Sequence, residues 1–302
     1  MSSDIVKVLV SKKNELKKFM SKIEEVGSAV IFNPLKLSDS ELVTERYIFN
    51  KPLSSINDPN AVPIINFQRS GENVVMTTLG KVGKSVVSNL TSAYISSPSN
   101  FNFFIPVDVE FKSYFSEKNI YLKNKKEVFD LSNDFPEGLT GSRIHNNNIY
   151  VVTTGRDIYY SKLSQLQWIK IELYKVNTIS IGDDNRLYSA TENGVFVIDE
   201  NKIEEFKIPS AINIHEVLLH ENKILLNIQR KKIISYEISD DGKEHLSEYN
   251  VQEGREISLK GCSNFFGGVL TITSNPIGRI DNVSFLTIPS LKVMEHPKRI
   301  HV

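Results

Sequence analysis

Hydrophobic and polar residues alternate with a period of two along most of the chain from Ser28 onward. Short runs of Val, Ile, Phe, Tyr and Thr are separated by Gly, Asn, Asp, Ser and Pro, and this pattern predicts β-strands joined by turns. We expect no second long helix among these runs, which argues against alternating βα units and a parallel sheet. The predicted fold class is therefore all-β.

One segment, residues 11–26, has helical spacing instead. Its apolar positions fall on one face of a helix, and lysines fill much of the remainder; the apolar positions are Leu16, Phe19, Met20, Ile23 and Val26. Gly27 follows as a natural stop. We interpret the segment as a short surface helix packed on the main body. The alternative is a basic amphipathic helix that binds a membrane surface or a partner.

A hairpin pattern recurs along the chain, with a polar turn, a strand, a short turn and a second strand. The copies that show it best are residues 148–163, 186–201 and 223–239. The first apolar residues of successive hairpins are Val74, Ile120, Ile149, Leu187, Ile224 and Val269, at intervals of 46, 29, 38, 37 and 45 residues. A four-stranded propeller blade takes about 40 to 50 residues. The spacing therefore predicts six repeats over residues 61–296, and residues 28–56 form either a seventh blade or an N-terminal extension.

One complete blade can be followed in the sequence. Its four predicted strands are Thr178–Ile181, Leu187–Ser189, Val195–Ile198 and Ile203–Ile208, and Asn193–Gly194 is expected to supply positive φ in the central turn. The segment DDNRLYSATENGVFVIDEN resembles the repeat of regulator-type β-propellers, through Asp184, Asn185, Leu187, Tyr188, Ala190, Thr191, Gly194, Val195 and Phe196. The resemblance implies a WD40-like β-propeller of six or seven four-stranded blades, with seven preferred, although the WD dipeptide is missing.

The pattern predicts two parts, an N-terminal strand and helix at residues 1–27 and a β-propeller at residues 28–302. We expect the strand Ile5–Val10 to pair with a C-terminal strand such as Leu291–Met294, because such pairing protects strand edges.

Composition changes the picture in two ways. The chain has 36 Lys plus Arg and 36 Asp plus Glu, and this balance argues against a dedicated nucleic-acid binder. Its single cysteine, Cys262, permits no internal disulfide and is interpreted as an inert buried residue. With no secretion signal and no apolar run long enough to span a membrane, we expect a soluble cytoplasmic protein.

No residue pattern in the sequence points to a catalytic, cofactor-binding or metal-binding site. The six histidines show none of the short spacings typical of metal ligands. The segment GKVGKS at 80–85 contains glycines, Lys84 and Ser85, but its spacing differs from a phosphate-binding loop, and we expect VVSNL after it to continue as a strand. Paired acids such as Asp183 and Asp184 are interpreted as solvated turns.

Two basic runs are the candidate interaction loops, and we expect both at the turn between the middle strands of a blade. Their residues are Lys123, Lys125 and Lys126 in one run and Arg230, Lys231 and Lys232 in the other. The simple interpretation is that these charges keep hairpin tips soluble. The alternative is nucleic-acid binding on one shared face, with Tyr121, Phe129 and Tyr236 stacking on bases.

The leading functional hypothesis is a non-catalytic scaffold that holds other proteins, for example as a structural subunit of a large assembly or a viral particle. The first alternative is a propeller hydrolase with its active site at the central channel. Three or more convergent acids or histidines there would favour the enzyme, whereas an apolar or Ser/Asn lining would favour the scaffold. The second alternative is a nucleic-acid-binding propeller.

Overall fold

A computed structural model describes residues 29–36, 42–48, 64–96, 104–106, 110–182, 184–206, 208, 213–220, 223–238, 244–263, 268–287 and 292–294. The chain forms two compact units. Unit 1 comprises Met1–Asp108, Lys118–Pro136 and Pro297–Val302, and unit 2 comprises Val109–Glu117 and Glu137–His296. The predicted N-terminal strand, the helix at 11–26 and the boundary after residue 27 lie outside the described residues.

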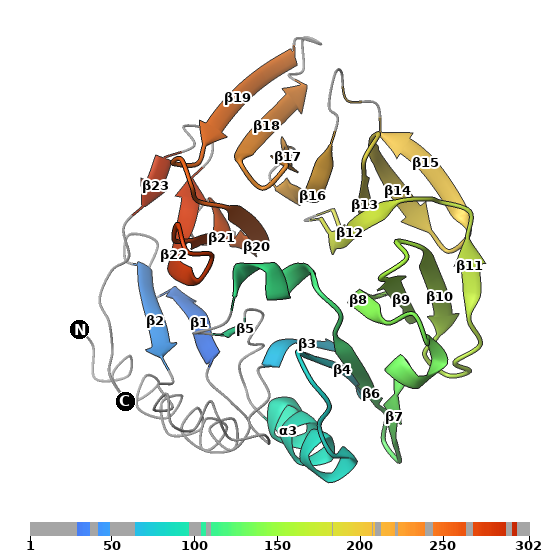
Figure 1. Cartoon of the computed structure of the whole chain (residues 1–302). Helices are drawn as coiled ribbons and strands as arrows, with labels where there is room; N and C mark the ends of the chain where they lie inside the picture. The colour runs from blue at the N-terminus through green and yellow to red at the C-terminus, as the bar shows by residue number, and fades with distance from the viewer. Residues whose placement is uncertain are drawn as a thin grey trace. The chain divides into compact units, whose positions relative to one another are not determined.

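Unit 2 contains four antiparallel sheets of four strands that follow one another along the chain (Figure 1). The first sheet consists of β8 (Leu139–His145), β9 (Asn148–Thr153), β10 (Ile158–Lys162) and β11 (Ile169–Ile171). The second consists of β12 (Val176–Ile181), β13 (Leu187–Thr191), β14 (Val195–Asp199) and β15 (Lys202–Phe206). The third consists of β16 (Ile214–His220), β17 (Lys223–Ile228), β18 (Lys232–Ile238) and β19 (Glu244–Asn250). The fourth consists of β20 (Ile257–Ser263), β21 (Gly268–Ser274), β22 (Ile280–Thr287) and β23 (Lys292–Met294).

Strands in each of these four sheets pair in chain order, so each of the four is a simple meander. The first strands of adjacent sheets, β8, β12, β16 and β20, lie next to one another and are called the inner strands here. This is the arrangement of β-propeller blades. The blade followed in the sequence is confirmed as the β12–β15 sheet.

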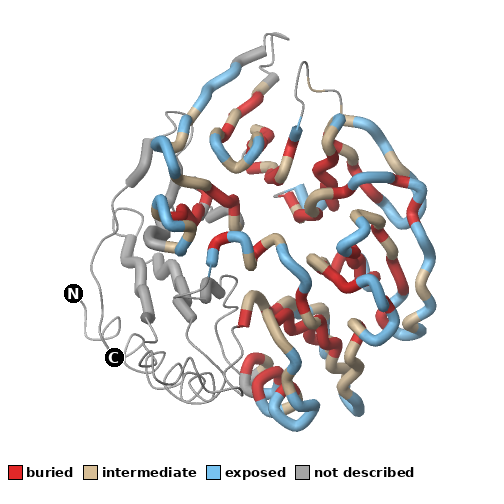
Figure 2. Tube along the Cα trace, in the orientation of Figure 1, coloured by how far each residue is buried: buried red, intermediate tan, exposed pale blue. Residues whose placement is uncertain are grey.

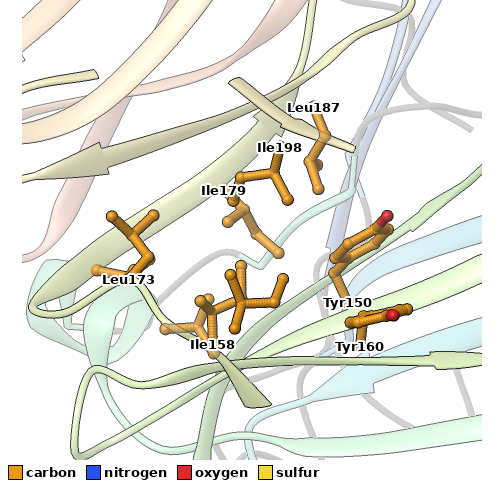
Figure 3. Close-up of a cluster of buried hydrophobic side chains, with 10 residues drawn as sticks. Tyr150, Ile158, Tyr160, Leu173, Ile179, Leu187 and Ile198 are labelled. Atoms are coloured by element: carbon orange, nitrogen blue, oxygen red, sulfur yellow. The ribbon is translucent and has the colours of Figure 1, made fainter. Parts of the chain in front are cut away.

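Hydrophobic cores lie between successive sheets, because side chains alternate between the two faces of a strand. Leu187 and Ile198 pack against the β8–β11 sheet, where Tyr150 stacks on Tyr160 with ring centroids 5.8 Å apart (Figure 3). Tyr188, on the opposite face, packs against the β16–β19 sheet instead. A third core joins that sheet to the β20–β23 sheet. Burial on both faces explains why the central strand β13 is buried throughout, while the edge strand β15 is largely exposed (Figure 2).

Polar side chains connect inner strands β12 and β16 in a regular way. Asn177 Nδ2 donates to the Ile214 carbonyl (2.6 Å), Thr178 Oγ1 to that of His215 (3.1 Å), and Ser180 Oγ to that of Val217 (2.5 Å). Each of these bonds spans 37 residues of sequence. The carbonyls that accept these bonds belong to β16 and lie on the side of this strand that faces away from β17, where its described sheet ends.

The central turn of the β12–β15 sheet forms without the predicted positive φ at Asn193 or Gly194. The Thr191 hydroxyl accepts from the backbone N–H groups of both residues (3.2 and 3.1 Å) and closes the turn. Positive φ occurs in the neighbouring turns, at Asn185 (58°) and Glu200 (53°). A side chain therefore holds this turn in place of a left-handed backbone.

Unit 1 contains one four-stranded sheet in the order β3-β4-β6-β7 and one three-stranded sheet in the order β2-β1-β5. The first consists of β3 (Ile64–Ser70), β4 (Asn73–Thr78), β6 (Asn119–Lys123) and β7 (Val128–Asp130), followed by the short 3-10 helix η2 (Leu131–Asp134). The second consists of β1 (Ala29–Lys36), β2 (Leu42–Ile48) and β5 (Phe104–Pro106).

The repeat count inferred from the sequence needs a correction. Val74 and Ile120 were assigned to separate repeats, but β4 and β6 pair directly within one sheet. A helix and β5 are inserted between these two strands, which lengthens the interval. The described residues contain five four-stranded sheets and one of three strands, so a count of six or seven four-stranded blades is not confirmed.

The expectation that VVSNL continues as a strand is wrong. Residues Lys84–Ser96 form helix α3, and Val87, Leu90 and Tyr94 provide its buried face. Their spacing of three and four residues is helical, and Tyr94 stacks on Phe67 at 5.0 Å. The spacing of GKVGKS still differs from a phosphate-binding loop, although a helix now follows it.

A second short helical segment, and not a strand, begins at Phe111. After β5 the chain forms the 3-10 helix η1 (Phe111–Phe115), which belongs to unit 2. The Phe111 N–H donates to the Gly278 carbonyl at 2.8 Å, and Glu110 forms a bridge with Arg279. These contacts hold η1 against the β21–β22 turn.

Candidate functional site

The first basic run lies in the β6–β7 turn of unit 1. Lys123 Nζ donates to Ser92 Oγ on α3 (3.2 Å), and Lys125 forms an ion pair with Glu72 at 2.5 Å. Lys126 is exposed, in a turn closed by the Asn124 side chain. Two of the three lysines therefore have partners within the unit.

The second basic run lies in the β17–β18 turn of unit 2, where Gln229 and Arg230 have φ of 50° and 60°. Arg230 stacks over the Phe115 ring at 4.9 Å and lies 3.6 Å from a Glu256 carboxylate oxygen. The other two cations are also engaged: Lys231 donates to the Arg255 carbonyl (2.9 Å) and Lys232 pairs with Glu248 (3.2 Å). The Arg230 carbonyl accepts from the first N–H of β20 at 2.9 Å. This turn therefore joins adjacent sheets.

The two runs do not occupy equivalent turns, so this premise of the nucleic-acid hypothesis is wrong. One lies between the third and fourth strands of its sheet and the other between the second and third. In a meander these turns lie at opposite ends of the sheet. Two of the aromatic residues proposed to stack on bases, Tyr121 and Tyr236, are buried, at 1% and 3% exposure.

A polar cluster on the inner strands of unit 2 was not predicted. Its centre is Glu216 of β16, whose side chain is 7% exposed. Glu216 Oε1 accepts from Ser258 Oγ (2.6 Å), and Oε2 accepts from Asn227 Nδ2 (2.6 Å) and from the Leu259 N–H (2.9 Å). One carboxylate thus connects three strands, β16, β17 and β20.

Two cations lie near this carboxylate. Lys260 is an unpaired residue at a β-bulge in β20, and its Nζ lies 3.7 Å from the centroid of the Tyr114 ring in η1. Burial lowers the pKa of Lys260 to about 8, with Glu216 opposing the shift and Arg143 adding to it. Burial also lowers the pKa of Arg143, and Glu216 again opposes the shift. Glu216 thus favours the charged form of both cations, and Arg143 disfavours that of Lys260.

A second aromatic residue of η1, Phe115, also contacts a cation, Arg230. Phe115 lies under Arg230 and meets the His215 ring edge-on at 6.4 Å. Burial lowers the pKa of His215, and Arg230 lowers it further. The positive charge of this region therefore disfavours a charged imidazole.

Sequence periodicity alone did not reveal the cluster. Arg143, Glu216 and Lys260 stand in three different repeats, and the β-bulge changes the direction of Lys260 relative to simple alternation. The one feature of the sequence that could have indicated these residues is that each is a charged residue within a strand-forming run. No group of three potential metal ligands occurs within the described residues, and no described helix has the length and apolar character needed to cross a membrane.

No known protein family and no curated protein matches the chain. Among solved structures, the β-propeller domain of Cps50 (Swd1) from Myceliophteria thermophila has a TM-score of 0.45 and 12% identity, covering 78% of this chain and 85% of that one. The β-propeller domain of the trilobed protease from Pyrococcus furiosus has a TM-score of 0.39 and 15% identity, covering 77% and 71%.

PorZ, a surface component of the type-IX secretion system of Porphyromonas gingivalis, has a TM-score of 0.43 and 11% identity over 78% of this chain. The match covers 33% of PorZ, so this chain spans about a third of that protein. The similar solved structures thus include β-propeller domains.

Proposed function

We propose that the chain is a β-propeller that acts as a non-catalytic scaffold for other proteins. The observation that carries the proposal is the exposed outer edge of the β8–β11 sheet, with Tyr159, Lys170 and Tyr174 together at one face and Ile169 on the other face of β11; these four residues are called the edge patch. Ile169 is 50% exposed and Tyr174 is 63% exposed. The ammonium group of Lys170 lies 6.0 Å from the Tyr159 ring centroid and 5.9 Å from that of Tyr174.

The composition of the edge patch suits protein recognition. Tyrosine gives a large rigid contact area, and aromatic residues are enriched where interfaces gain most of their binding energy. Lys170 also pairs with Asp157 at 2.8 Å, which fixes its position between the rings. Strand β11 is the edge of its sheet and has one free side. A partner with an apolar surface would bury the exposed Ile169 and Tyr174 side chains.

The test is capture of partners from the cells that produce the protein, using wild type and two variants. The double variant Ile169→Ser/Tyr174→Ala removes the patch. Leu246→Ser is the matched control, because Leu246 is 60% exposed on β19, the edge strand of a different sheet. We expect one stoichiometric partner with wild type and with the control, and its loss with the double variant. Retention of the partner by the double variant would exclude the edge patch, and no partner with wild type would count against a scaffold.

The hydrolase alternative stays a prediction. The described inner strands bring together one carboxylate and two cations, a composition different from the three convergent acids or histidines that would favour an enzyme. The nucleic-acid alternative is tested by titrating generic DNA and RNA at low salt, where the phosphate contribution is strongest.

A further inference from the structure

We propose that η1 is a gate on unit 2, which opens away from the inner strands β16 and β20 while the sheets of this unit stay folded. The gate goes beyond the scaffold proposal, because the edge patch lies on a different sheet and has no part in it. In the closed state that the structure shows, η1 lies beside β20 (Figure 1) and covers basic side chains of two adjacent sheets.

The first step of the argument is the place that η1 occupies. In three sheets of unit 2, a backbone carbonyl in the turn between the second and third strands accepts from an N–H at the start of the next inner strand. In the β20–β23 sheet the carbonyl of this turn, that of Gly278, accepts from the Phe111 N–H of η1 at 2.8 Å. η1 therefore begins where the inner strand of a further sheet would begin. The donor–acceptor pairs of the three other sheets are Val176–Arg156 (2.9 Å), Asn213–Glu192 (2.8 Å) and Ile257–Arg230 (2.9 Å).

The second step is how η1 is held there. The inner strands β12, β16 and β20 each form a ladder with the second strand of their own sheet. Within the described part of the chain, the backbone of η1 joins a sheet only through the Phe111 hydrogen bond and the isolated bridge between Glu110 and Arg279. Segments with few such bonds open locally at a lower free-energy cost than paired strands. Phe111 is fully buried, and its side chain stabilises the closed state.

The third step is what the gate covers. The Tyr114 ring lies over the Lys260 ammonium group of β20 at 3.7 Å. The next residue, Phe115, lies 4.9 Å from the Arg230 guanidinium and meets the His215 ring of β16 edge-on at 6.4 Å. Cation–π attraction holds both aromatic rings, and it is lost once a ring moves away from its cation. Opening therefore uncovers three basic side chains from two adjacent sheets at the same time.

The first test compares the hydrogen-exchange rates of three backbone N–H groups in the full-length protein, followed by NMR after transfer to heavy water. The reporters are Phe111, Val176 and Ile257, because each donates to the same kind of turn carbonyl. We expect the Phe111 N–H to exchange at least about tenfold faster than the other two, since gate opening frees it while the ladders stay intact. Equal rates for the three groups would overturn the proposal.

The second test locks the gate with a disulfide. Glu110 and Arg279 are antiparallel bridge partners and are both exposed, and Cα atoms in such pairs lie about 4.5–5.5 Å apart, within the range that a disulfide spans. The variant is Glu110→Cys/Arg279→Cys with Cys262→Ser, which removes the single native cysteine. In its oxidised form the Phe111 N–H should exchange at least about tenfold more slowly than in its reduced form, with the Val176 N–H unchanged.

Acetylation by an N-hydroxysuccinimide ester, followed by peptide mass spectrometry, reports on the covered side chains of the same variant. Lys260 should react at least about twofold faster in the reduced form, whereas Lys170, which also lies over tyrosine rings, should react equally in both forms. Equal slowing of Phe111 and Val176 exchange on oxidation would indicate global unfolding and overturn the proposal, as would equal acetylation of Lys260 in both forms. The wild-type exchange rates decide the question even if the cysteine variant fails to fold.

Discussion

Replacing Glu216 is expected to destabilise unit 2 more than replacing any exposed acid. In Glu216→Leu, the Ser258 hydroxyl and the Leu259 N–H lose this acceptor in a buried place, and the Asn227 amide keeps only the Ile257 carbonyl. Each stranded donor costs about 1–3 kcal/mol, and removing one member of a buried polar network costs roughly 3–5 kcal/mol in total, because the effects do not add fully. Glu216→Gln keeps the shape and can still accept from two donors while donating to Ser258. Its expected cost is therefore lower, about 1–2 kcal/mol.

The assay is urea unfolding followed by fluorescence of Trp168, the only tryptophan, which lies in unit 2 beside β11. Glu192→Gln is the control, because this carboxylate is partly exposed and pairs with Arg156 at the surface, where such pairs contribute about 0–1 kcal/mol. The free energy of unfolding is expected to be highest for the control, lower for Glu216→Gln and lowest for Glu216→Leu. If the leucine variant were as stable as the control, the inferred role of this carboxylate would be refuted.

Three further changes test other parts of the structure. Gly182→Ala would place a Cβ 2.8 Å from the Leu219 Cβ, so we expect a loss of about 1–3 kcal/mol in urea unfolding, whereas Gly141→Ala, with open space around it, should cost less. Lys260→Met should be more stable than wild type at neutral pH, because the folded state lowers the pKa of Lys260 and disfavours its charge. Between pH about 8 and about 10.5, the folded wild type binds fewer protons than the unfolded wild type, so its stability rises with pH. The stability difference between Lys260→Met and wild type should therefore shrink across this window. A constant difference would contradict the lowered pKa of Lys260. Tyr188→Phe removes the 2.6 Å hydrogen bond from the Tyr188 hydroxyl to Asp184. Burial raises the pKa of Asp184, but the hydrogen bonds from Tyr188 and Arg186 outweigh this effect, so that the pKa is lowered overall. When the pH falls below about 4, wild type should therefore lose more stability than the variant in unfolding measurements.

Local pattern predicted the fold class well, because both faces of these strands are buried and turns separate them at near-regular intervals. The β12–β15 sheet was located strand by strand. Helix α3 was missed, since Val87, Leu90 and Tyr94 lie among β-branched residues that also suit a strand. The repeat count was misjudged at Val74 and Ile120, because hydrophobic anchors carry no information about which strands pair across an insertion.

The candidate sites divide in the same way. The sequence located both basic turns, but whether their charges are free depends on neighbours such as Glu72 and Phe115, which are distant in the chain. The edge patch required knowledge of which strand ends its sheet.

By itself, then, the sequence determined strands, turns and repetition, because these depend on the side chains of a few consecutive residues. Only the tertiary structure decided that Glu216, Asn227 and Ser258 meet, since they stand on three different strands and are joined by hydrogen bonds of 2.6 Å. Charge compensation depends on distance in space, and sheet packing alone fixes that distance.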